Sequence, residues 1–263
     1  MTESAEPTVH YTSVDGLAHL VLNRPAQLNA MTPEMVDEIR AAVASAATDG
    51  SRVLLISAAG RGFCAGRDIA GAEPGQEDGG EVLAGIFNPL MQQVADLPFP
   101  TIAAVQGACL GTGLGLALAC DVVLAADNAK FGSPFGKIGA VFDSGGHKVF
   151  VERLGTAVTF DLIYSGRFLS GAEAAAVGLV SRVVPADELL SMATAYAAGL
   201  AAGPVLAFAE SKRIVREVAD TPSSLAKVLD LEAQAQSRAS RTADYVEGFT
   251  AFLERRAPVF RGQ

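Results

Sequence analysis

The sequence predicts an α/β fold followed by a helical tail. Two features of this chain of 263 residues support the prediction. Up to about residue 144, short apolar runs alternate with segments of helical periodicity, an order that favours parallel βαβ units. Beyond that point nearly every segment has a helical pattern instead.

Turn and capping signals predict the first elements. Residues 9–14 and 17–22 are short, partly apolar runs, and the Asp15-Gly16 link between them is typical of a β-hairpin. Thr32-Pro33-Glu34 predicts a helix start, because it offers a cap, a proline in the first turn and an acid at the positive end of the helix dipole. Residues 53–56 form a continuous apolar run, which predicts a strand buried on both faces.

The same periodicities predict the remaining elements. The predicted strands are 101–106, 121–126 and 180–184, and the predicted helices are 81–96, 111–119, 156–164, 171–176, 186–201, 204–218, 222–239 and 242–256. The segment 71–80 (GAEPGQEDGG) is glycine-rich and acidic and lacks any large apolar residue. We expect a mobile surface loop there, and a lid over a neighbouring pocket is the alternative.

Composition argues against several classes of function. A formal charge of −9 gives the chain no general attraction for nucleic acid or an anionic membrane, so local cations and backbone amides must hold any anionic ligand. The most apolar window, 101–126, contains four glycines and Asp121 and is expected to be buried core. The N-terminal residues lack the apolar run of a signal peptide, and the three cysteines match neither a zinc site nor a disulfide framework. We therefore expect a cytoplasmic location.

Two glycine-rich turns carry the main functional signal. Each follows a predicted buried strand: residues 60–69 read GRGFCAGRDI, and residues 107–115 read GACLGTGLG. Glycine lets a backbone turn sharply and approach a ligand closely. The second turn enters an apolar helix, whose first amides are unpaired and lie at the positive end of the dipole. Two such turns can direct two amides at one carbonyl oxygen, as in an oxyanion hole.

Other interpretations of the two turns stay open on these residues alone. Neither turn has the Gly-Lys-Ser/Thr ending of a nucleotide-binding P-loop, and the second does not match a dinucleotide fingerprint. Tight packing between helix and strand, without any ligand, is the simplest alternative.

Several segments together resemble the successive signatures of the crotonase (enoyl-CoA hydratase/isomerase) superfamily. They are 22–25 with 28–30, 60–69, 102–126 and 243–253. The resemblance implies a ClpP/crotonase-like spiral of ββα units, with an acyl-CoA-binding core over 1–200 and a helical trimerisation region over 201–263. It also implies a homotrimer or a dimer of trimers. The implied ligand is an acyl-CoA thioester, so coenzyme A enters as part of the substrate, and no separate cofactor or metal is expected.

The resemblance also assigns roles to single positions. The oxyanion-hole donors would be the backbone amides of Arg67 and Thr112, and this threonine is a mild departure from the glycine that the family often has there. The residues implied in binding coenzyme A or substrate are Arg24, Ala26, Ala65, Asp68, Ile69, Gly113, Phe135, Phe252 and Arg255. In the family, residues like Phe252 and Arg255 often reach the ligand from a neighbouring subunit. The alternative for either arginine is a solvated surface charge.

The chain departs from the family's hydratases at the positions of the chemistry. Those enzymes resemble one another in using two glutamates to hold and activate water, and the matching positions here are Gly115 and Phe135. Neither side chain can exchange a proton, so hydration by the two-glutamate route is not expected. Glutamates placed at both positions are expected to introduce some hydration.

Asp143 is the candidate catalytic base. Apolar residues precede it and a Gly-Gly helix start follows it, so we expect a partly desolvated carboxylate with a raised pKa. A simple helix cap is the alternative, because aspartate is favoured at that position. Similarity to Asp-type enoyl-CoA isomerases, and above all to ring-1,2-epoxyphenylacetyl-CoA isomerases, implies the catalytic role. Similarity to 4-chlorobenzoyl-CoA dehalogenases is weaker, because Gln92 stands where they place a histidine.

The sequence thus predicts an acyl-CoA isomerase in which Asp143 removes a proton next to the reacting carbons and returns it elsewhere. An atypical enoyl-CoA hydratase that uses Asp143 with bound water is the alternative among enzymes. A protein that binds acyl-CoA without catalysis is the alternative outside them.

Overall fold

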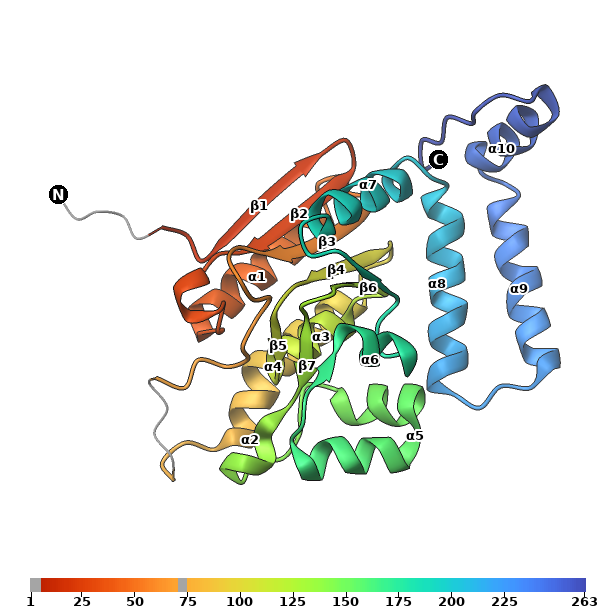
Figure 1. Cartoon of the computed structure of the whole chain (residues 1–263). Helices are drawn as coiled ribbons and strands as arrows, with labels where there is room; N and C mark the ends of the chain where they lie inside the picture. The colour runs from red at the N-terminus through yellow and green to blue at the C-terminus, as the bar shows by residue number, and fades with distance from the viewer. Residues whose placement is uncertain (1–5, 71–74) are drawn as a thin grey trace.

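A six-stranded sheet forms the centre of the computed structural model, which describes residues 6–70 and 75–263 (Figure 1). In sheet order the strands are β1 (Val9–Val14), β2 (Leu17–Leu22), β3 (Val53–Ala58), β4 (Thr101–Val105), β6 (Val122–Ala126) and β9 (Arg182–Val184). β1 and β2 form the expected antiparallel hairpin, and all other neighbours in this sheet are parallel. The predicted α/β fold with parallel units is confirmed.

Helices cover both faces of this sheet. α1 (Pro33–Ala46), α3 (Asn88–Ala95) and α4 (Thr112–Ala119) pack on one face, and α7 (Leu189–Ala201) packs on the other. Because side chains alternate along a strand, Leu54 and Ile56 join the first cluster while Val53 and Leu55 join the α7 cluster, and all four are fully buried. The prediction of a strand buried on both faces is therefore correct.

Three short strands form a second sheet that was not predicted. They are β5 (Ala108–Leu110), β7 (Lys130–Gly132) and β8 (Leu169–Ser170), with β7 between the other two. Strands of two or three residues are too short to show periodicity, and these exist because chain segments far apart in sequence pair with one another. β5 matters for function because it leads directly into α4.

The segment predicted as one helix over 81–96 is helical as far as Ala95, but it is not a uniform α-helix. It contains the end of α2 (Gly79–Val82), a π-helical turn (Leu83–Phe87) and α3. The Asp78 carboxylate accepts hydrogen bonds from the first amides of α2, so the last two residues of the expected 71–80 loop are helical. Residues 71–74 of that loop lie outside the described residues.

The second half of the chain is mainly helical. α5 (Gly146–Ser165) bends at Gly155 and contains the predicted 156–164 helix, and α6 (Gly171–Ala176) follows β8. The last helices are α8 (Val205–Asp220), α9 (Leu225–Ala239) and α10 (Ala243–Glu254), and they stand apart from the sheet (Figure 1). Over the described residues, no single helix has both the length and the apolarity needed to cross a membrane.

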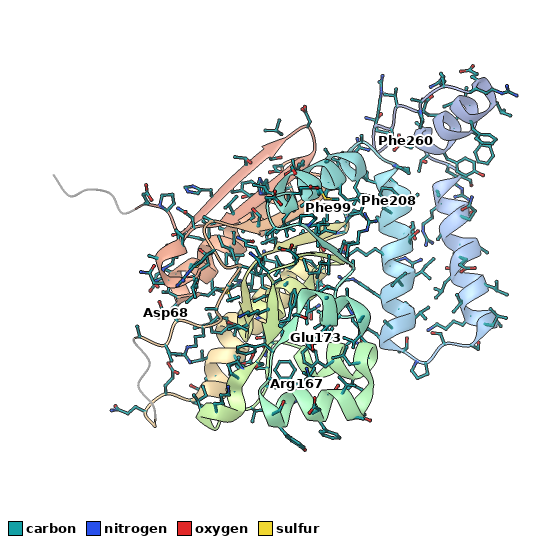
Figure 2. All side chains as sticks on the ribbon, in the orientation of Figure 1. Asp68, Phe99, Arg167, Glu173, Phe208 and Phe260 are labelled. Atoms are coloured by element: carbon teal, nitrogen blue, oxygen red, sulfur yellow. The ribbon has the colours of Figure 1, made fainter. Side chains whose placement is uncertain are left out.

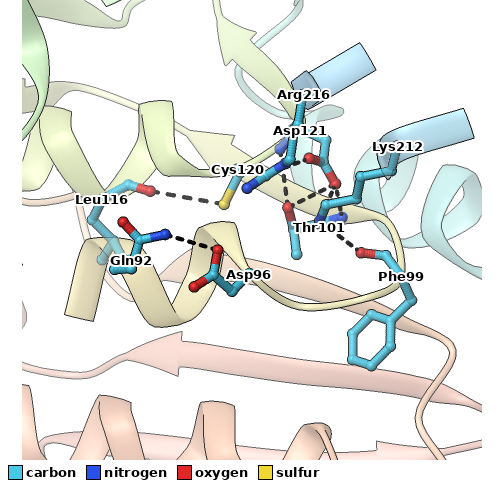
Figure 3. A network of polar contacts seen from close by, with 9 residues as sticks. All are labelled: Gln92, Asp96, Phe99, Thr101, Leu116, Cys120, Asp121, Lys212 and Arg216. Atoms are coloured by element: carbon cyan, nitrogen blue, oxygen red, sulfur yellow. Dashed lines mark hydrogen bonds and ion pairs between the residues drawn. The ribbon is translucent and has the colours of Figure 1, made fainter. Parts of the chain in front are cut away.

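Asp121 joins α8 to the sheet (Figure 3). Its carboxylate accepts hydrogen bonds from the amide and the hydroxyl of Thr101, at 2.9 and 3.0 Å. It also pairs with Lys212 at 2.8 Å and Arg216 at 3.1 Å, both on α8. Lys212 donates a further hydrogen bond to the Phe99 carbonyl, and burial lowers the pKa of its ammonium group. Asp121 is therefore the centre of a network that ties the helical region to the core.

Candidate active site

The two glycine turns selected from the sequence lie side by side. The Cys64 amide donates a hydrogen bond to the Ala108 carbonyl, and the Leu110 amide donates one to the Cys64 carbonyl, both at 2.9 Å. Gly66 has a φ of 105°, and a side chain there would begin only 3.0 Å from the Leu110 carbonyl oxygen. A glycine is required at this position both by the left-handed backbone and by the close approach of the second turn.

Each turn presents one backbone amide without a protein acceptor within the part of the chain that the structure describes. Arg67 stands opposite Met31 in a parallel β-bridge. The two hydrogen bonds of the bridge join Met31 to the Gly66 carbonyl and to the Asp68 amide, so the Arg67 amide points away from Met31. Thr112 begins α4, where first-turn amides have no partner within the helix. A side chain on Gly66 would begin 3.7 Å from the Thr112 nitrogen. The two donors therefore belong to adjoining backbone, as an oxyanion hole requires.

Asn29 holds the segment that leads into the first turn. It is fully buried, its side-chain oxygen accepts a hydrogen bond from the Arg24 amide at 2.7 Å, and its amide group donates to the carbonyls of Ala59 and Gly62 at 2.9 Å. These bonds fix Arg24 relative to the turn. In the sequence, the only signal for Asn29 is its place in a signature segment, which does not distinguish it as a site residue.

Arg24 is anchored beside the first turn. Its guanidinium pairs with the Asp68 carboxylate at 2.9 Å and donates to the Ala30 carbonyl. The Ala70 amide, followed by the Arg24 guanidinium, holds the pKa of the Asp68 carboxyl below its usual range. The other predicted binding residues on this side are Ala26, Ala65 and Ile69, of which Ala26 and Ile69 are exposed. A purely solvated surface charge is therefore the wrong description of Arg24.

Asp143 is partly buried, and it is not the cap of a helix. The residue before α5 is Gly145, and no side chain caps that helix. The Asp143 Oδ1 atom instead accepts a hydrogen bond from the Ser144 hydroxyl at 2.7 Å. Burial raises the pKa of Asp143, opposed by that hydrogen bond and by the charge of His147. The alternative of a capping aspartate is thus wrong, and the expected rise in pKa is present.

Gly115 brings Asp143 next to α4. A side chain on Gly115 would collide with the Ser144 Cβ atom and would begin 2.8 Å from the Ser144 carbonyl oxygen. The segment that carries Asp143 therefore packs directly against the helix that Thr112 begins. The expectation that glutamates at 115 and 135 introduce hydration is corrected here, because position 115 has no room for a glutamate in this backbone.

Phe135 forms an apolar wall beside the second turn. It lies in the 3-10 helix Pro134–Ile138 and is partly buried. Its Cζ atom lies 3.1 Å from the point where a side chain on Gly111 would begin, one residue before the Thr112 amide. Gly113, one residue after that amide, is buried against Cys64. The site thus has an aromatic side chain where the two-glutamate pattern has a carboxylate.

The thiols in the turns do not supply a nucleophile. Cys64 and Cys109 are fully buried. Burial raises the pKa of Cys64 to about 12 and that of Cys109 well above its usual value. Both are therefore neutral at ordinary pH, so neither thiol is a candidate nucleophile or base.

Three residues named in the sequence analysis lie elsewhere. Phe252 is on α10 and is 81% exposed, and Arg255 directly follows that helix. α10 lies at the opposite end of the molecule from Asp68 (Figure 1 and Figure 2). Within one chain they do not reach the turns. Gln92 donates a hydrogen bond to Asp96 at 2.7 Å (Figure 3). It also lines a cavity of about 660 Å³ between α3 and α8.

Comparisons with known proteins show which proteins the whole chain resembles. The family described as enoyl-CoA hydratase/isomerase matches residues 12–263. The 1,2-epoxyphenylacetyl-CoA isomerase of Escherichia coli is 37% identical, over 94% of this chain and 96% of that protein. The 2,3-dehydroadipyl-CoA hydratase of the same organism is 34% identical, over 93% and 94%. The crystal structure of an enoyl-CoA hydratase from Bacillus anthracis superposes with a TM-score of 0.90 at 29% identity, over 97% of this chain and 100% of that one.

Proposed function

The chain belongs to the enoyl-CoA hydratase/isomerase family, and from that membership we propose that it is an acyl-CoA isomerase with Asp143 as its acid/base. The thioester carbonyl would accept hydrogen bonds from the Arg67 and Thr112 amides. The Asp143 carboxylate would take a proton from the carbon next to that carbonyl. Coenzyme A would enter as part of the substrate, so no separate cofactor is needed.

The proton transfer balances with a single carboxylate. When Asp143 removes a proton from C2 of a 3-enoyl thioester, the electron pair of the C–H bond is delocalised onto the carbonyl oxygen. The two amides stabilise the negative charge that develops there. Asp143 then returns the same proton to C4, and the double bond moves to C2–C3. Because the base keeps the proton between the two steps, no second acid is required.

The observation that carries this proposal is the placing of one ionisable carboxylate next to α4. Asp143 lies on the segment that packs against Gly115, and its pKa is raised by burial. A raised pKa is closer to the value that suits a general base at neutral pH. Neither Gly115 nor Phe135 can activate water, which favours isomerisation over hydration by two glutamates.

The substitution Asp143→Asn tests the proposal. Asparagine keeps the shape of the side chain but cannot accept the proton, so isomerisation of a 3-enoyl-CoA should fall at least about a hundredfold. Affinity for saturated butyryl-CoA, measured by calorimetry, should change little. Full isomerase activity in this variant would defeat the proposal.

A second candidate, an atypical hydratase that uses Asp143 with water, is favoured by the hydratase names among the relatives. Product analysis separates the two enzymes. A hydratase converts a 2-enoyl-CoA into a 3-hydroxyacyl-CoA, whereas the isomerase moves the double bond without adding water. A protein that only binds acyl-CoA would show affinity but no exchange of C2 protons for deuterium.

A further inference from the structure

Asp143 is held between two neighbours that are themselves fixed. On one side, Phe142 is only 5% exposed and packs against Phe150 with 4.8 Å between ring centroids. Its ring lies so close to Gly146 that any side chain on Gly146 would collide with it. Phe142, the residue before Asp143, is therefore held in place by core packing.

On the other side, Ser144 adopts a backbone conformation that is rare for its residue type. Its φ is 55°, in the left-handed region, and it is only 7% exposed. Such strain persists where the surrounding structure imposes it, and it is concentrated at functional sites. Here the surrounding structure is α4, because Ser144 occupies the space that a side chain on Gly115 would need.

We infer that Ser144 is a positioning residue for Asp143 and that glycine at position 115 makes this placement possible. The Ser144 hydroxyl fixes Oδ1 of the carboxylate at 2.7 Å. Among the described residues, Oδ2 accepts no hydrogen bond, so it is the oxygen available for the substrate proton. The inference rests on the proposed role of Asp143 and adds how its carboxylate is oriented.

This arrangement excludes the two-glutamate arrangement in the same backbone. A side chain at position 115 would begin 2.8 Å from the Ser144 carbonyl, and relief would require the main chain of Ser144 to move. Moving Ser144 would also move Asp143, to which it is joined. The residue at position 115 therefore determines whether this segment can present an aspartate.

Few charged groups act on the Asp143 carboxylate. The facing helix α4 (TGLGLALA) carries no acid or base. On the 3-10 helix before Asp143, Lys137 lies over the Phe168 ring at 5.9 Å. On α5, His147 packs against the Phe142 ring, with 5.2 Å between centroids, and its charge favours the ionised carboxylate. The Ser144 hydroxyl also favours the ionised carboxylate, so its removal should raise the pKa of Asp143.

The inference is tested with Ser144→Ala and Ser144→Gly. Both remove the hydroxyl, and the glycine variant also removes the left-handed strain. We expect each variant to exchange the C2 protons of butyryl-CoA with solvent deuterium about tenfold more slowly, because a hydrogen bond to a charged group is lost. Calorimetric affinity for butyryl-CoA should stay within about twofold of the parent, since the Arg67 and Thr112 amides are untouched. The acid limb of the rate profile should move to higher pH.

Gly115→Ala tests the steric part. The added methyl group must displace Ser144, so exchange should slow more than in Ser144→Gly. In the double variant Gly115→Ala/Ser144→Gly part of the collision is absent, and the combined loss should be smaller than the product of the two single losses. Gly199→Ala is the matched control, because Gly199 also lies within a helix but has open space around it, and this variant should behave as the parent.

The outcomes separate this inference from the proposed function. If Asp143→Asn keeps full exchange, or if the parent shows none, the proposed function fails. If Asp143→Asn is inactive while both Ser144 variants keep the parental rate and acid limb, the inference alone is overturned. An equal loss of rate and of butyryl-CoA affinity in Ser144→Ala would also overturn it, since that result would indicate general distortion.

Discussion

The partial burial of Asp143 has a cost in stability. Burial raises the pKa of its carboxyl, so the folded chain holds the proton more tightly than the unfolded chain does. The stability that this carboxyl contributes is complete below the unfolded pKa, and it is lost as pH rises through the raised folded value. At neutral pH the ionised group therefore destabilises the fold.

From this sign we predict that Asp143→Asn raises the free energy of unfolding at pH 7. The gain amounts to about 1.4 kcal/mol for each unit by which the folded pKa exceeds the unfolded one. Denaturant unfolding of parent and variant should show a difference that shrinks as pH falls toward 4. The stability of the variant minus that of the parent should be larger at pH 7 than at pH 4. The opposite order would contradict the assignment of the pKa shift to burial.

Arg24 and Arg255 provide a second prediction at single positions. If both contact coenzyme A phosphates, Arg24→Ala/Arg255→Ala should weaken butyryl-CoA binding by about tenfold or more and flatten its dependence on salt. Calorimetry at several salt concentrations measures both effects. Arg213→Ala, which removes an exposed arginine paired with Glu210 on α8, is the control and should change neither. Unchanged affinity in the double variant would remove both residues from the site.

The sequence could identify Asp143 but not the residues that place it. The apolar neighbours of Asp143 made a raised pKa predictable, because desolvation depends largely on local composition. The roles of Ser144, Gly115 and Asn29 depend on contacts between segments far apart in the chain. Ser144 meets a helix that lies about 30 residues earlier, and no local pattern encodes that contact.

Among the elements, length decided what could be predicted. The strands of the main sheet and most of the helices show regular periods, and their predicted ranges match within a few residues. The exception is α5, which begins at Gly146, whereas the predicted helix begins at residue 156. The short strands of the second sheet have no period of their own, because they depend on pairing between distant segments. The π-helical turn Leu83–Phe87 lies inside a helical segment and does not change its apolar pattern enough to be predicted. One of these short strands, β5, leads directly to Thr112, so an element that the sequence did not predict lies beside the candidate site.

The attachment of α8 to the sheet gives a prediction for an element. Asp121→Asn keeps the size of the side chain but leaves the nearly buried Lys212 ammonium without its charged partner. We expect the free energy of unfolding to fall by about 1–3 kcal/mol. Glu217→Gln, which removes an exposed pair with Lys227 on neighbouring helices, is the control and should cost less than about 1 kcal/mol. Equal and small losses in both variants would show that Asp121 does not anchor α8.

In the molecule as a whole, the helical end exposes apolar surface that a single chain leaves uncovered. Phe249, Phe252 and Leu253 on α10 are 58%, 81% and 78% exposed. A cavity of about 460 Å³ lined mainly by apolar groups lies between α8 and α10, and Phe249 contributes to it. Exposed apolar surface of this kind is typical of an interface between subunits. Phe252 and Arg255 can then meet coenzyme A only if α10 approaches the turns of another chain.

The final prediction joins assembly to binding. Light scattering at micromolar concentration should show a trimer or a dimer of trimers, and a stable monomer of the parent chain would contradict this. Phe249→Asp places a charge on the apolar surface, so it should shift the chain toward monomer. If Arg255 serves a neighbouring site, the same variant should weaken butyryl-CoA binding about as much as Arg255→Ala does. Leu190→Asp on α7, at a residue that is 52% exposed, is the matched control and should alter neither mass nor affinity. A monomeric Phe249→Asp protein with parental affinity would show that each chain binds its ligand alone.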